Sequence, residues 1–403
     1  MKVALFTCPN PQLESPTAHF PIGLLYVGKS LLDAGHDVSI VDLRSRKLIT
    51  KNDIPDVDIV GVTSTSGEIH YAKKIARLAR GKGILTMVGG AHATFMPDDC
   101  STDFDFVILG DGEVAVTYAL SHGPGKYCKP LETISGYSPD WNLIGNNGFS
   151  SELFTGAGYG EGPLAAGITA SRGCPYKCSY CRSKVNQVRY RLVNEVGTEI
   201  TKLVIGYGIR YYRFYDDCLT LNRERSLELF NLLRKLHIHW RAHTRSNLWT
   251  DELAREARKS GCDEMGFGFE AVTDSVLKKV RKQETVDQHR EAVKVCKRNS
   301  VICKAFWMVG LPGQGWDEIE DIKKFMLKEK PDKWIVSLFS PYPGSDVYAH
   351  PDNYGVSWID PDLSNYWNFP NSPTIAYHDN PASEIQKQYI HLKSWLEDNF
   401  GRF

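Results

Sequence analysis

Residues 165–181 read AAGITASRGCPYKCSYC, an apolar segment followed directly by three cysteines within eight residues. The run 165–171 is short and apolar and ends at a loop that contains glycine and proline, which is typical of a buried β-strand. Cys174, Cys178 and Cys181 follow with the spacing CxxxCxxC. Three thiols so close together after a strand predict a metal site or a redox site.

Further strands and helices alternate on the C-terminal side of this loop. The segments 210–217, 239–245, 263–270, 303–310 and 332–340 have the apolar pattern of strands, and helical patterns separate them. Thr285 and Gln288 form a capping box at the start of one of these helices. Six strand-helix units predict a barrel or partial barrel over 161–348, with its sites at the C-terminal face of the strands. The cysteine loop belongs to that face.

A similar alternation precedes the loop. Apolar runs at 3–6, 38–43, 58–66, 84–90 and 105–113 are separated by helical patterns, so a doubly wound parallel sheet is expected over 1–125. Residues 126–160, rich in glycine, proline, serine and asparagine, are the expected linker, and 349–403 form an aromatic segment and a final helix. The fold class is therefore α/β, a Rossmann-like sheet followed by a partial (β/α)6 barrel and a small C-terminal segment.

Ligands of doubly wound sheets bind beyond the carboxyl ends of the strands. Glycines there let a flat ligand approach the backbone, and hydroxyls can donate to it. The GxGxxG pattern is missing after the first strand, so a conventional dinucleotide site is not expected. The candidate cofactor-binding residues at this edge are Thr63, Ser64, Thr65, Ser66, Gly89, Gly90, His92, Thr94, Gly110, Gly112 and Glu113.

Composition limits the other classes of function. Lysine plus arginine and aspartate plus glutamate each number 48, so no overall basic field attracts nucleic acid, which is not expected as a partner. No run approaches membrane-spanning length, and the N-terminus lacks a signal-peptide pattern. We therefore expect a cytoplasmic protein with no membrane partner. Its ten cysteines should be mostly reduced there.

The chemistry of the cysteine loop can be narrowed by its ligand count. A structural zinc site closes with four ligands, and no second Cys or His pair at zinc spacing follows Cys181. Thioredoxin-like chemistry needs only two cysteines and leaves Cys174 unexplained. Iron-sulfur clusters are normally held by four thiolates, so three suggest a cluster with one iron open to an exchangeable ligand.

This loop, with Tyr180 before its last cysteine, resembles the signature of the radical S-adenosylmethionine (SAM) superfamily. The segments FYDD, HWRAHTR, GFGFE, MVGLPG and SPYPGS resemble successive strand ends of the subfamily that carries an N-terminal cobalamin-binding domain. PIGLLYVGKSLLDAGHDVSIVDL, VGGAHATFMPDD and ILGDGE resemble that cobalamin domain in the same order. The resemblance extends to about residue 348.

The resemblance implies a function and a set of cofactors. Cys174, Cys178 and Cys181 would hold a [4Fe-4S] cluster that binds SAM and cleaves it to a 5'-deoxyadenosyl radical. That radical would abstract hydrogen from a small-molecule substrate, followed by methyl transfer from methylcobalamin. A flavodoxin or ferredoxin would supply electrons.

The resemblance also implies roles for residues at the barrel's strand ends. Asp216, Asp217, Arg245 and Glu270 would contact SAM or substrate, although the common GGE motif is absent. A structural salt bridge at the mouth of the barrel is the alternative for each of these four. Tyr180 would pack near the adenine or fill space beside the cluster, and Gly310 would shape a loop near the adenine.

Other functions stay open at this level. One alternative is a radical SAM isomerase or ring-forming enzyme, with or without bound cobalamin, since the first domain can be a scaffold that has lost its cofactor. The first domain lacks the DxHxxG motif, but the subfamily that it resembles generally lacks this motif too, so its absence decides little. A second alternative is a non-enzymatic cobalamin or redox sensor. If both cofactors bind, we expect them to face one another across the substrate.

Overall fold

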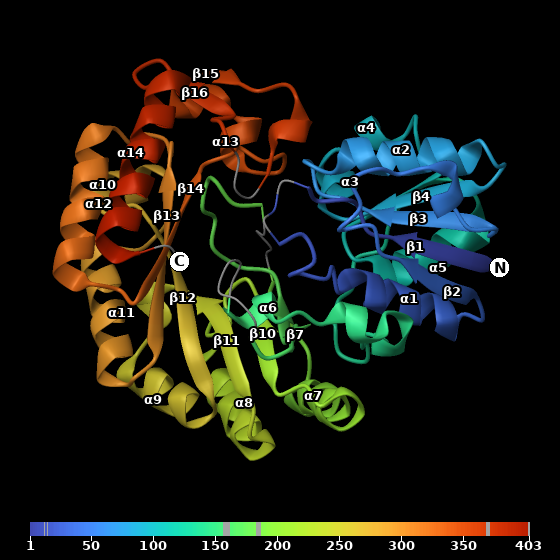
Figure 1. The fold of residues 1–403 in the computed structure, drawn as a ribbon, viewed down its shortest axis with the longest axis horizontal. Helices are drawn as coiled ribbons and strands as arrows, with labels where there is room; N and C mark the ends of the chain where they lie inside the picture. The colour runs from blue at the N-terminus through green and yellow to red at the C-terminus, as the bar shows by residue number, and fades with distance from the viewer. Residues whose placement is uncertain (12, 14, 156–161, 183–186, 368–370, 402–403) are drawn as a thin grey trace. The chain divides into compact units, whose positions relative to one another are not determined.

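The computed structural model describes every residue of the chain except 12, 14, 156–161, 183–186, 368–370 and 402–403. The chain divides into two compact units. The first unit contains Met1–Ser150 and Asp362–Trp367, and the second contains Ser151–Pro361 and Asn368–Phe403. Each unit is built around a six-stranded sheet (Figure 1).

The sheet of the first unit has the order β2-β1-β3-β4-β5-β6, and all its neighbouring strands are parallel. Because β2 and β3 flank β1, the chain switches direction across the sheet at β1, where a doubly wound fold places its ligand crevice. The strands are β1 (Lys2–Phe6), β2 (Asp37–Val41), β3 (Ile59–Thr63), β4 (Leu85–Gly89), β5 (Phe106–Leu109) and β6 (Gly125–Cys128).

Helices cover both faces of this sheet. Leu5 packs toward Gly28 of α1, whereas the next residue, Phe6, joins a core with Ala72 and Ile75 of α2. Alternate residues of a strand point to opposite faces, so α1 and α2 lie on opposite sides, which confirms the doubly wound prediction. The helices are α1 (Gly23–Asp33), α2 (Ile69–Arg80), α3 (Ala91–Phe95), α4 (Pro97–Cys100) and α5 (Gly112–His122).

The segment expected as a linker, 126–160, contains regular structure. Most of β6 lies in it, and β6 pairs with β5 at the edge of the sheet. Trp141, in the short helix η2 (Trp141–Leu143), stacks on Phe149 with ring centres 5.4 Å apart. The segment as far as Ser150 belongs to the first unit. Its end, 156–160, lies outside the described residues.

The sheet of the second unit runs in chain order, β7-β10-β11-β12-β13-β14, and every pair is parallel. This is the arrangement of a partial (β/α)6 barrel, as predicted. The strands are β7 (Ala165–Ile168), β10 (Tyr211–Phe214), β11 (His239–Thr244), β12 (Cys262–Glu270), β13 (Ile302–Val309) and β14 (Lys333–Leu338).

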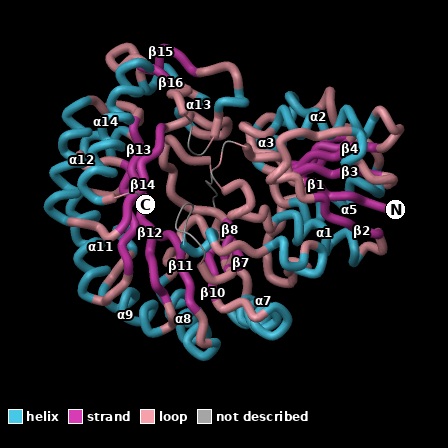
Figure 2. The backbone as a smooth tube through the Cα atoms, viewed as in Figure 1, coloured by secondary structure: helices cyan, strands magenta, loops and turns pink. Residues whose placement is uncertain are grey.

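Helices pack on the outer face of this curved sheet (Figure 2). Trp240 of β11 stacks on Phe230 of α8 at 5.2 Å, and Trp307 of β13 meets Phe325 of α12 edge to face at 5.4 Å. Residues of the other parity, such as Arg241, therefore point to the inner face. The main helices are α7 (Val193–Tyr207), α8 (Arg223–Leu236), α9 (Asp251–Lys259), α11 (Val286–Arg298), α12 (Trp316–Glu329) and α14 (Ala382–Phe400).

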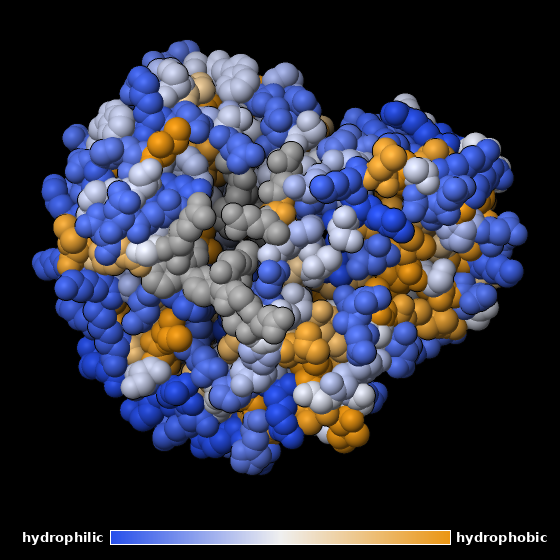
Figure 3. Space-filling model, viewed as in Figure 1, coloured by the Kyte–Doolittle hydropathy of each residue, from blue (hydrophilic) through white to orange (hydrophobic). Residues whose placement is uncertain are grey.

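Among the described residues, nine short helices and strands complete the second unit, and the short helix η6 (Leu363–Asn365) belongs to the first unit. The capping box of α11 is confirmed, because Thr285 and Gln288 exchange hydrogen bonds at 2.9 and 3.4 Å. Hydrophilic residues cover most of the outer helices in the view of Figure 3. No described helix is long and apolar enough to cross a membrane. The short elements are α6 (Glu152–Thr155), β8 (Ser171–Arg172), β9 (Arg189–Tyr190), η4 (Ser246–Leu248), α10 (Asp274–Lys279), α13 (Asp346–Ala349), η5 (Pro351–Tyr354), β15 (Val356–Ile359), η6 (Leu363–Asn365) and β16 (Ile375–Tyr377).

Candidate active site

The cysteine loop leaves β7 at the carboxyl edge of the second unit's sheet. Cys178 is buried, Cys174 and Cys181 are half-buried, and none of the three forms a disulfide. The Cys181 amide donates to the Cys178 carbonyl at 3.2 Å, and the Ser179 amide donates to the Val280 carbonyl at 2.9 Å. These bonds hold the loop in a tight turn against the residues that follow α10.

The three thiols fit an iron-sulfur cluster better than a single metal ion. Among the described residues, no three or more His, Cys, Asp or Glu side chains gather closely enough to hold one ion. A tetrahedral ion draws all its ligands to one point, whereas in a cluster each thiolate binds a different iron. Burial raises the pKa of Cys174 to about 11, so binding of iron there releases a proton.

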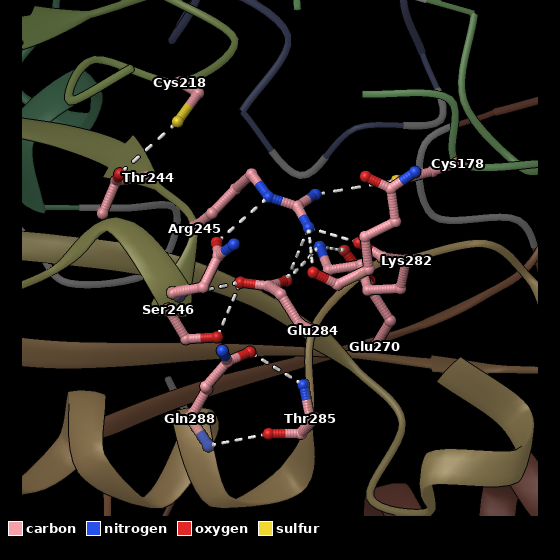
Figure 4. A network of polar contacts seen from close by, with 12 residues as sticks. Cys178, Cys218, Thr244, Arg245, Ser246, Glu270, Lys282, Glu284, Thr285 and Gln288 are labelled. Carbon is pink, nitrogen blue, oxygen red and sulfur yellow. Dashed lines mark hydrogen bonds and ion pairs between the residues drawn. The ribbon is translucent and has the colours of Figure 1, made fainter. Parts of the chain in front are cut away.

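Arg245 directly follows β11 and points at the cysteine loop (Figure 4). Its Nη1 lies 3.7 Å from Cys178 Sγ, and its guanidinium carbon lies 3.6 Å from the centre of the Tyr176 ring. Its Nη2 donates to the Gln283 carbonyl at 3.2 Å and also to that of Lys282. A guanidinium fixed in this way places a charged hydrogen-bond donor beside the Cys178 sulfur.

Arg245 belongs to a buried network of two cations and two carboxylates (Figure 4). Lys282 Nζ lies 3.2 Å from Glu284 and 3.7 Å from Glu270, and Arg245 lies 3.6 Å from Glu284. Glu284 also accepts from Ser246 Oγ at 2.6 Å. Burial opposes ionisation of Glu284, but Lys282 and Arg245 hold its pKa below the usual value. We call Arg245, Lys282, Glu270 and Glu284 the mouth network. Its two formal positive charges balance its two formal negative charges.

Glu270 carries the two unusual features of the mouth network. Its φ is +67°, a left-handed conformation that costs energy for a residue with a side chain. Its Oε2 is buried without a hydrogen-bond partner among the described residues. Burial raises the pKa of Glu270, against the effect of Lys282. An unused buried acceptor fits a ligand donor, such as the ammonium or a ribose hydroxyl of SAM.

The two aspartates after β10 bind the start of the cysteine loop. Asp216 accepts from the Ala170 amide at 2.8 Å and from the Ser171 hydroxyl, and Asp217 accepts from the Gly173 amide at 3.0 Å. Burial raises the pKa of Asp216 to about 6, although both hydrogen bonds lower it. The geometry therefore gives these aspartates a positioning role toward the loop; contact with SAM stays a prediction.

Tyr180 and Gly310 lie at the same edge of the sheet. The Tyr180 ring centre is 6.0 Å from Lys282 Nζ, and burial raises the pKa of Tyr180. Gly310 has a φ of +93°, donates to Gln314 Oε1 at 2.9 Å and accepts from the Tyr377 hydroxyl at 2.7 Å. Gly310 therefore shapes the turn after β13, and its proximity to adenine stays a prediction.

Sequence analysis missed three residues of this site. Lys282 and Glu284 lie in RKQE, a charged turn after α10 that resembles any solvated surface turn. Only the fold buries both of them beside Arg245. Tyr176, between the first two cysteines, supplies the ring beneath the Arg245 guanidinium. An aromatic residue inside the cysteine spacing was the one available signal for Tyr176.

In the first unit, most hydroxyls after β3 bond to the protein. Ser64 donates to the Thr65 carbonyl and Thr65 donates to Glu68, both at 2.8 Å, and Ser66 Oγ lies 3.2 Å from His92 Nδ1. Thr63, half-buried at the end of β3, has no side-chain partner among the residues that the structure describes. Of the four candidate hydroxyls, Thr63 is therefore the one available to a ligand.

His92 is fully buried, and both of its ring nitrogens have protein partners. Nδ1 faces Ser66 Oγ, and Nε2 lies 2.9 Å from Asp99 Oδ2. The His92 amide also donates to the Ser64 carbonyl at 3.1 Å. His92 therefore connects the loop after β3 to α4, and its contact with a cofactor stays a prediction.

Gly90 and Thr94 join neighbouring strand ends. A Cβ at Gly90, where φ is +94°, would lie 2.8 Å from the Ser64 carbonyl oxygen and 2.9 Å from Thr63 Oγ1. Thr94 Oγ1 donates to the Gly90 carbonyl at 2.8 Å and accepts from the Gly110 amide at 3.0 Å. Glycine is required at position 90 by the protein's own loop, so a bulky substitution there would disturb packing first.

The remaining candidates separate into open and packed positions. A Cβ at Gly110 would meet nothing within 4 Å, and one at Gly89 would have its nearest neighbour at 3.8 Å. A Cβ at Gly112 would lie 2.6 Å from Val27, so that glycine lets α5 approach α1. Glu113 is buried on α5. The open backbone at Gly89 and Gly110, near the Thr63 hydroxyl, fits a large flat cofactor such as cobalamin.

A distant segment also reaches the loop after β3. Residues 362–367 pack in the first unit, where a Cβ at Gly67 would lie 2.5 Å from the Tyr366 carbonyl oxygen. Tyr366 and Trp367 are both buried. Sequence analysis placed these aromatics in the C-terminal segment and gave no sign that they adjoin the cofactor edge of the first sheet.

Two family models match the chain, one within each of the two units. Residues 13–120 match the B12 binding domain, and residues 168–326 match the radical SAM superfamily, a span that includes the three cysteines and the mouth network. Residues 168–326 form a domain of the radical SAM superfamily. Its first domain is of the B12-binding type, so the cofactors of this family are a [4Fe-4S] cluster, SAM and cobalamin.

Curated relatives of this radical SAM protein include enzymes of two kinds. An uncharacterized methyltransferase of Pyrococcus horikoshii is 29% identical over 82% of this chain and 78% of its own length. The anaerobic magnesium-protoporphyrin IX monomethyl ester cyclase of Rubrivivax gelatinosus is 25% identical over 72% of this chain and 58% of its own length.

Solved structures show the same fold. The radical SAM methyltransferase TsrM of Kitasatospora setae, with cobalamin and a [4Fe-4S] cluster bound, matches 100% of this chain and 86% of its own. The TM-score is 0.71 at 16% identity. A second TsrM structure, with tryptophan substrate and a SAM analogue, gives a TM-score of 0.69 at 16% identity and covers 88% of this chain and 76% of its own.

Proposed function

We propose that this radical SAM enzyme is a cobalamin-dependent methyltransferase that acts on a small molecule. The observation that carries the proposal is the loop of three cysteines, none in a disulfide, at the carboxyl edge of a parallel partial barrel, with Arg245 Nη1 3.7 Å from Cys178 Sγ. The B12-binding match of the first unit supports cobalamin as the methyl carrier.

The chain's own residues bind and orient the reactants. When bound, the cluster supplies one electron that cleaves SAM to methionine and a 5'-deoxyadenosyl radical, and cobalamin supplies the methyl group. Arg245 and the two aspartates after β10 hold the cysteine loop in place. Glu270 offers its unused Oε2 to SAM, and the buried mouth network keeps bulk water from the radical.

Small molecules are the proposed substrate class, and a flavodoxin or ferredoxin is the proposed electron donor. The balanced charge of the chain supports this class over nucleic acid. The related TsrM was solved with tryptophan, a small molecule, as its substrate.

The products of SAM turnover test the proposal. Methyl transfer to carbon consumes two SAM molecules, one to remethylate cobalamin and one to form the radical. Reconstituted protein that meets its substrate should therefore form S-adenosylhomocysteine and 5'-deoxyadenosine in equal amounts, with one methylated product. Formation of neither compound by the reduced protein would contradict the enzymatic function.

Ring formation or rearrangement is the second candidate, because the relatives include a ring-forming cyclase. Such a reaction needs the radical but no methyl group. It should give 5'-deoxyadenosine without S-adenosylhomocysteine, so the same product analysis separates the two functions.

A further inference from the structure

Four cationic side chains gather on the inner face of the second unit's sheet. Arg213 of β10 is in register with Arg241 of β11, which is in register with Glu264 of β12. Lys304 of β13 is in register with Lys333 of β14. Glu264 is the carboxylate that the described residues place among them. We call these five residues the inner cluster; its formal charge is four positive and one negative.

Both oxygens of that carboxylate are already occupied. Arg241 Nη1 donates to Glu264 Oε1 at 3.1 Å, and Lys333 Nζ donates to Oε2 at 2.8 Å. Burial opposes ionisation of Glu264, but Arg241, Lys304 and Lys333 lower its pKa, so it remains charged. Arg241 also donates to the Leu153 carbonyl of α6. Glu264 is therefore engaged by Arg241 and Lys333, and neither of its oxygens is hydrogen-bonded to Lys304.

Lys304 is the residue that this arrangement leaves unsatisfied. It is 6% exposed, and it has no hydrogen bond or ion pair with any residue that the structure describes. The Phe306 ring centre is 5.8 Å from its Nζ. Burial lowers the pKa of Lys304 to about 8; Glu264 opposes the shift, while Arg241, Lys333 and Arg213 add to it. A buried ammonium without a partner is costly and therefore rare unless a ligand completes it.

The inner cluster lies well below the mouth network. Lys304 is in register with Gly266, which lies four residues before Glu270 on β12, roughly 13 Å along a strand. At this level His243 and Phe306 pack over Gly266, since a Cβ there would lie 2.7 Å from each ring. A ligand group at Lys304 is therefore remote from the cysteine loop.

We propose that the inner cluster binds an oxyanion, a carboxylate or a phosphate, and that Lys304 is its direct partner. The assignment of that oxyanion to the substrate rests on the proposed function, whereas the anion site itself does not. Arg241, Lys304 and Lys333 share the carboxylate of Glu264, and this excess of positive charge on a buried face attracts an anion and repels cations. The substrate class is therefore a small molecule with an acidic group far from its reacting carbon.

Thermal unfolding of the full-length, cluster-reconstituted protein tests the oxyanion site. Lys304→Met removes the buried charge at similar volume, and Lys324→Met is the matched control, because Lys324 is exposed and paired with Asp321. Inorganic phosphate, at ionic strength matched with sodium chloride, should raise the Tm of the parent and of Lys324→Met. It should leave the Tm of Lys304→Met unchanged.

The same experiment distinguishes binding from a structural role. Without phosphate, Lys304→Met should melt above the parent, because an unsatisfied charge is removed. A structural lysine would give the reverse, a variant that melts lower. Equal phosphate shifts in parent and variant, or no shift in the parent, would overturn the site. If Lys304→Met fails to fold, a structural role is indicated, and Lys304→Gln repeats the phosphate comparison with a polar replacement.

A second arm separates a free anion from an anionic group of the substrate. Hexyl phosphate should bind the parent at least tenfold more tightly than inorganic phosphate, and Lys304→Met should lose this gain. Equal affinities would overturn the assignment to the substrate. Neither arm involves SAM cleavage, so failure here leaves the proposed function intact, while loss of 5'-deoxyadenosine formation leaves the anion site intact.

Discussion

The mouth network and the inner cluster are both buried groups of charged residues on one sheet, yet their charges are organised in opposite ways. At the mouth, Arg245 and Lys282 face Glu270 and Glu284, and each cation lies within 4 Å of a carboxylate. In the inner cluster, Lys304 has no such partner among the described residues. The mouth network is balanced in charge, whereas the inner cluster has an excess of positive charge that an anion would compensate.

The difference separates positioning from recognition. The mouth network fixes Arg245 beside Cys178 and offers Glu270 Oε2 to a ligand; Glu284 Oε2, which also lacks a hydrogen bond, is ion-paired with Lys282 and Arg245. The inner cluster fixes nothing at the cysteine loop and offers uncompensated positive charge. Removal of one charge should therefore have opposite effects on stability in the two regions, and this contrast can be measured.

The largest expected effect is at the mouth. Glu284→Gln keeps an oxygen that accepts from Ser246 but removes the negative charge. Glu270 is then the one carboxylate of the mouth network that remains for Lys282 and Arg245. Breaking a buried ion pair costs about 3–5 kcal/mol of unfolding free energy. Urea unfolding at neutral pH measures it. Glu291→Gln, an exposed change on α11, is the control and should alter the free energy by less than about 0.5 kcal/mol. A loss as small as the control's would contradict a coupled network.

The second effect has the opposite sign. Lys304→Met should raise the unfolding free energy by about 3 kcal/mol at pH 7, because the pKa of Lys304 is about 8 in the folded state and about 10.4 when unfolded. Between these values the unfolded state binds more protons, so the parent gains stability as pH rises from 8 to 10. The advantage of the variant should shrink over that range. If the difference in unfolding free energy between Lys304→Met and the parent does not change with pH, the charge of Lys304 does not destabilise the folded state.

A third effect concerns Asp216, which lies at the mouth but outside the network. Its pKa is about 6 in the folded state and about 3.9 when unfolded, so the folded state binds more protons between these values. The parent should lose about 2–3 kcal/mol relative to Asp216→Asn as pH rises from 4 to 7. Unfolding midpoints of both proteins across this range measure the difference. A flat difference would mean that Asp216 ionises normally.

The smallest effect tests whether α11 itself supports the mouth network. Thr285 caps this helix next to Glu284. Thr285→Ala should cost about 1 kcal/mol of unfolding free energy and leave SAM cleavage unchanged. A comparable loss in Glu284→Gln and Thr285→Ala would mean that Glu284 acts through the helix start rather than through its charge.

The fold followed from local patterns in the sequence. Apolar runs separated by helical periods were enough for two parallel sheets, because strands buried on both faces have a continuous apolar signal. The edge strand β6 was missed, since GKYC is short and mostly polar. The position of Tyr366 against Gly67 was missed too, because it joins residues about 300 positions apart.

The site was predictable where spacing alone determines the chemistry. Cys174, Cys178 and Cys181 were identified from eight residues of sequence. Lys282 and Lys304 were not, because whether a lysine is buried or exposed depends on sheet register and on which face of the strand points inward. Lys304 in CKAFWMVG looks like a single polar residue in an apolar strand, and only the neighbouring strands show that it lies among cations.

The measurement that tests the central claim most directly is formation of 5'-deoxyadenosine from SAM by the anaerobically reconstituted, reduced protein and by its three cysteine variants. The parent should form 5'-deoxyadenosine. Cys174→Ala, Cys178→Ala and Cys181→Ala should each lose both the cluster absorbance and this product, while circular dichroism shows the parent fold. A single variant that forms 5'-deoxyadenosine at the parent rate would contradict the assignment of the three cysteines as cluster ligands.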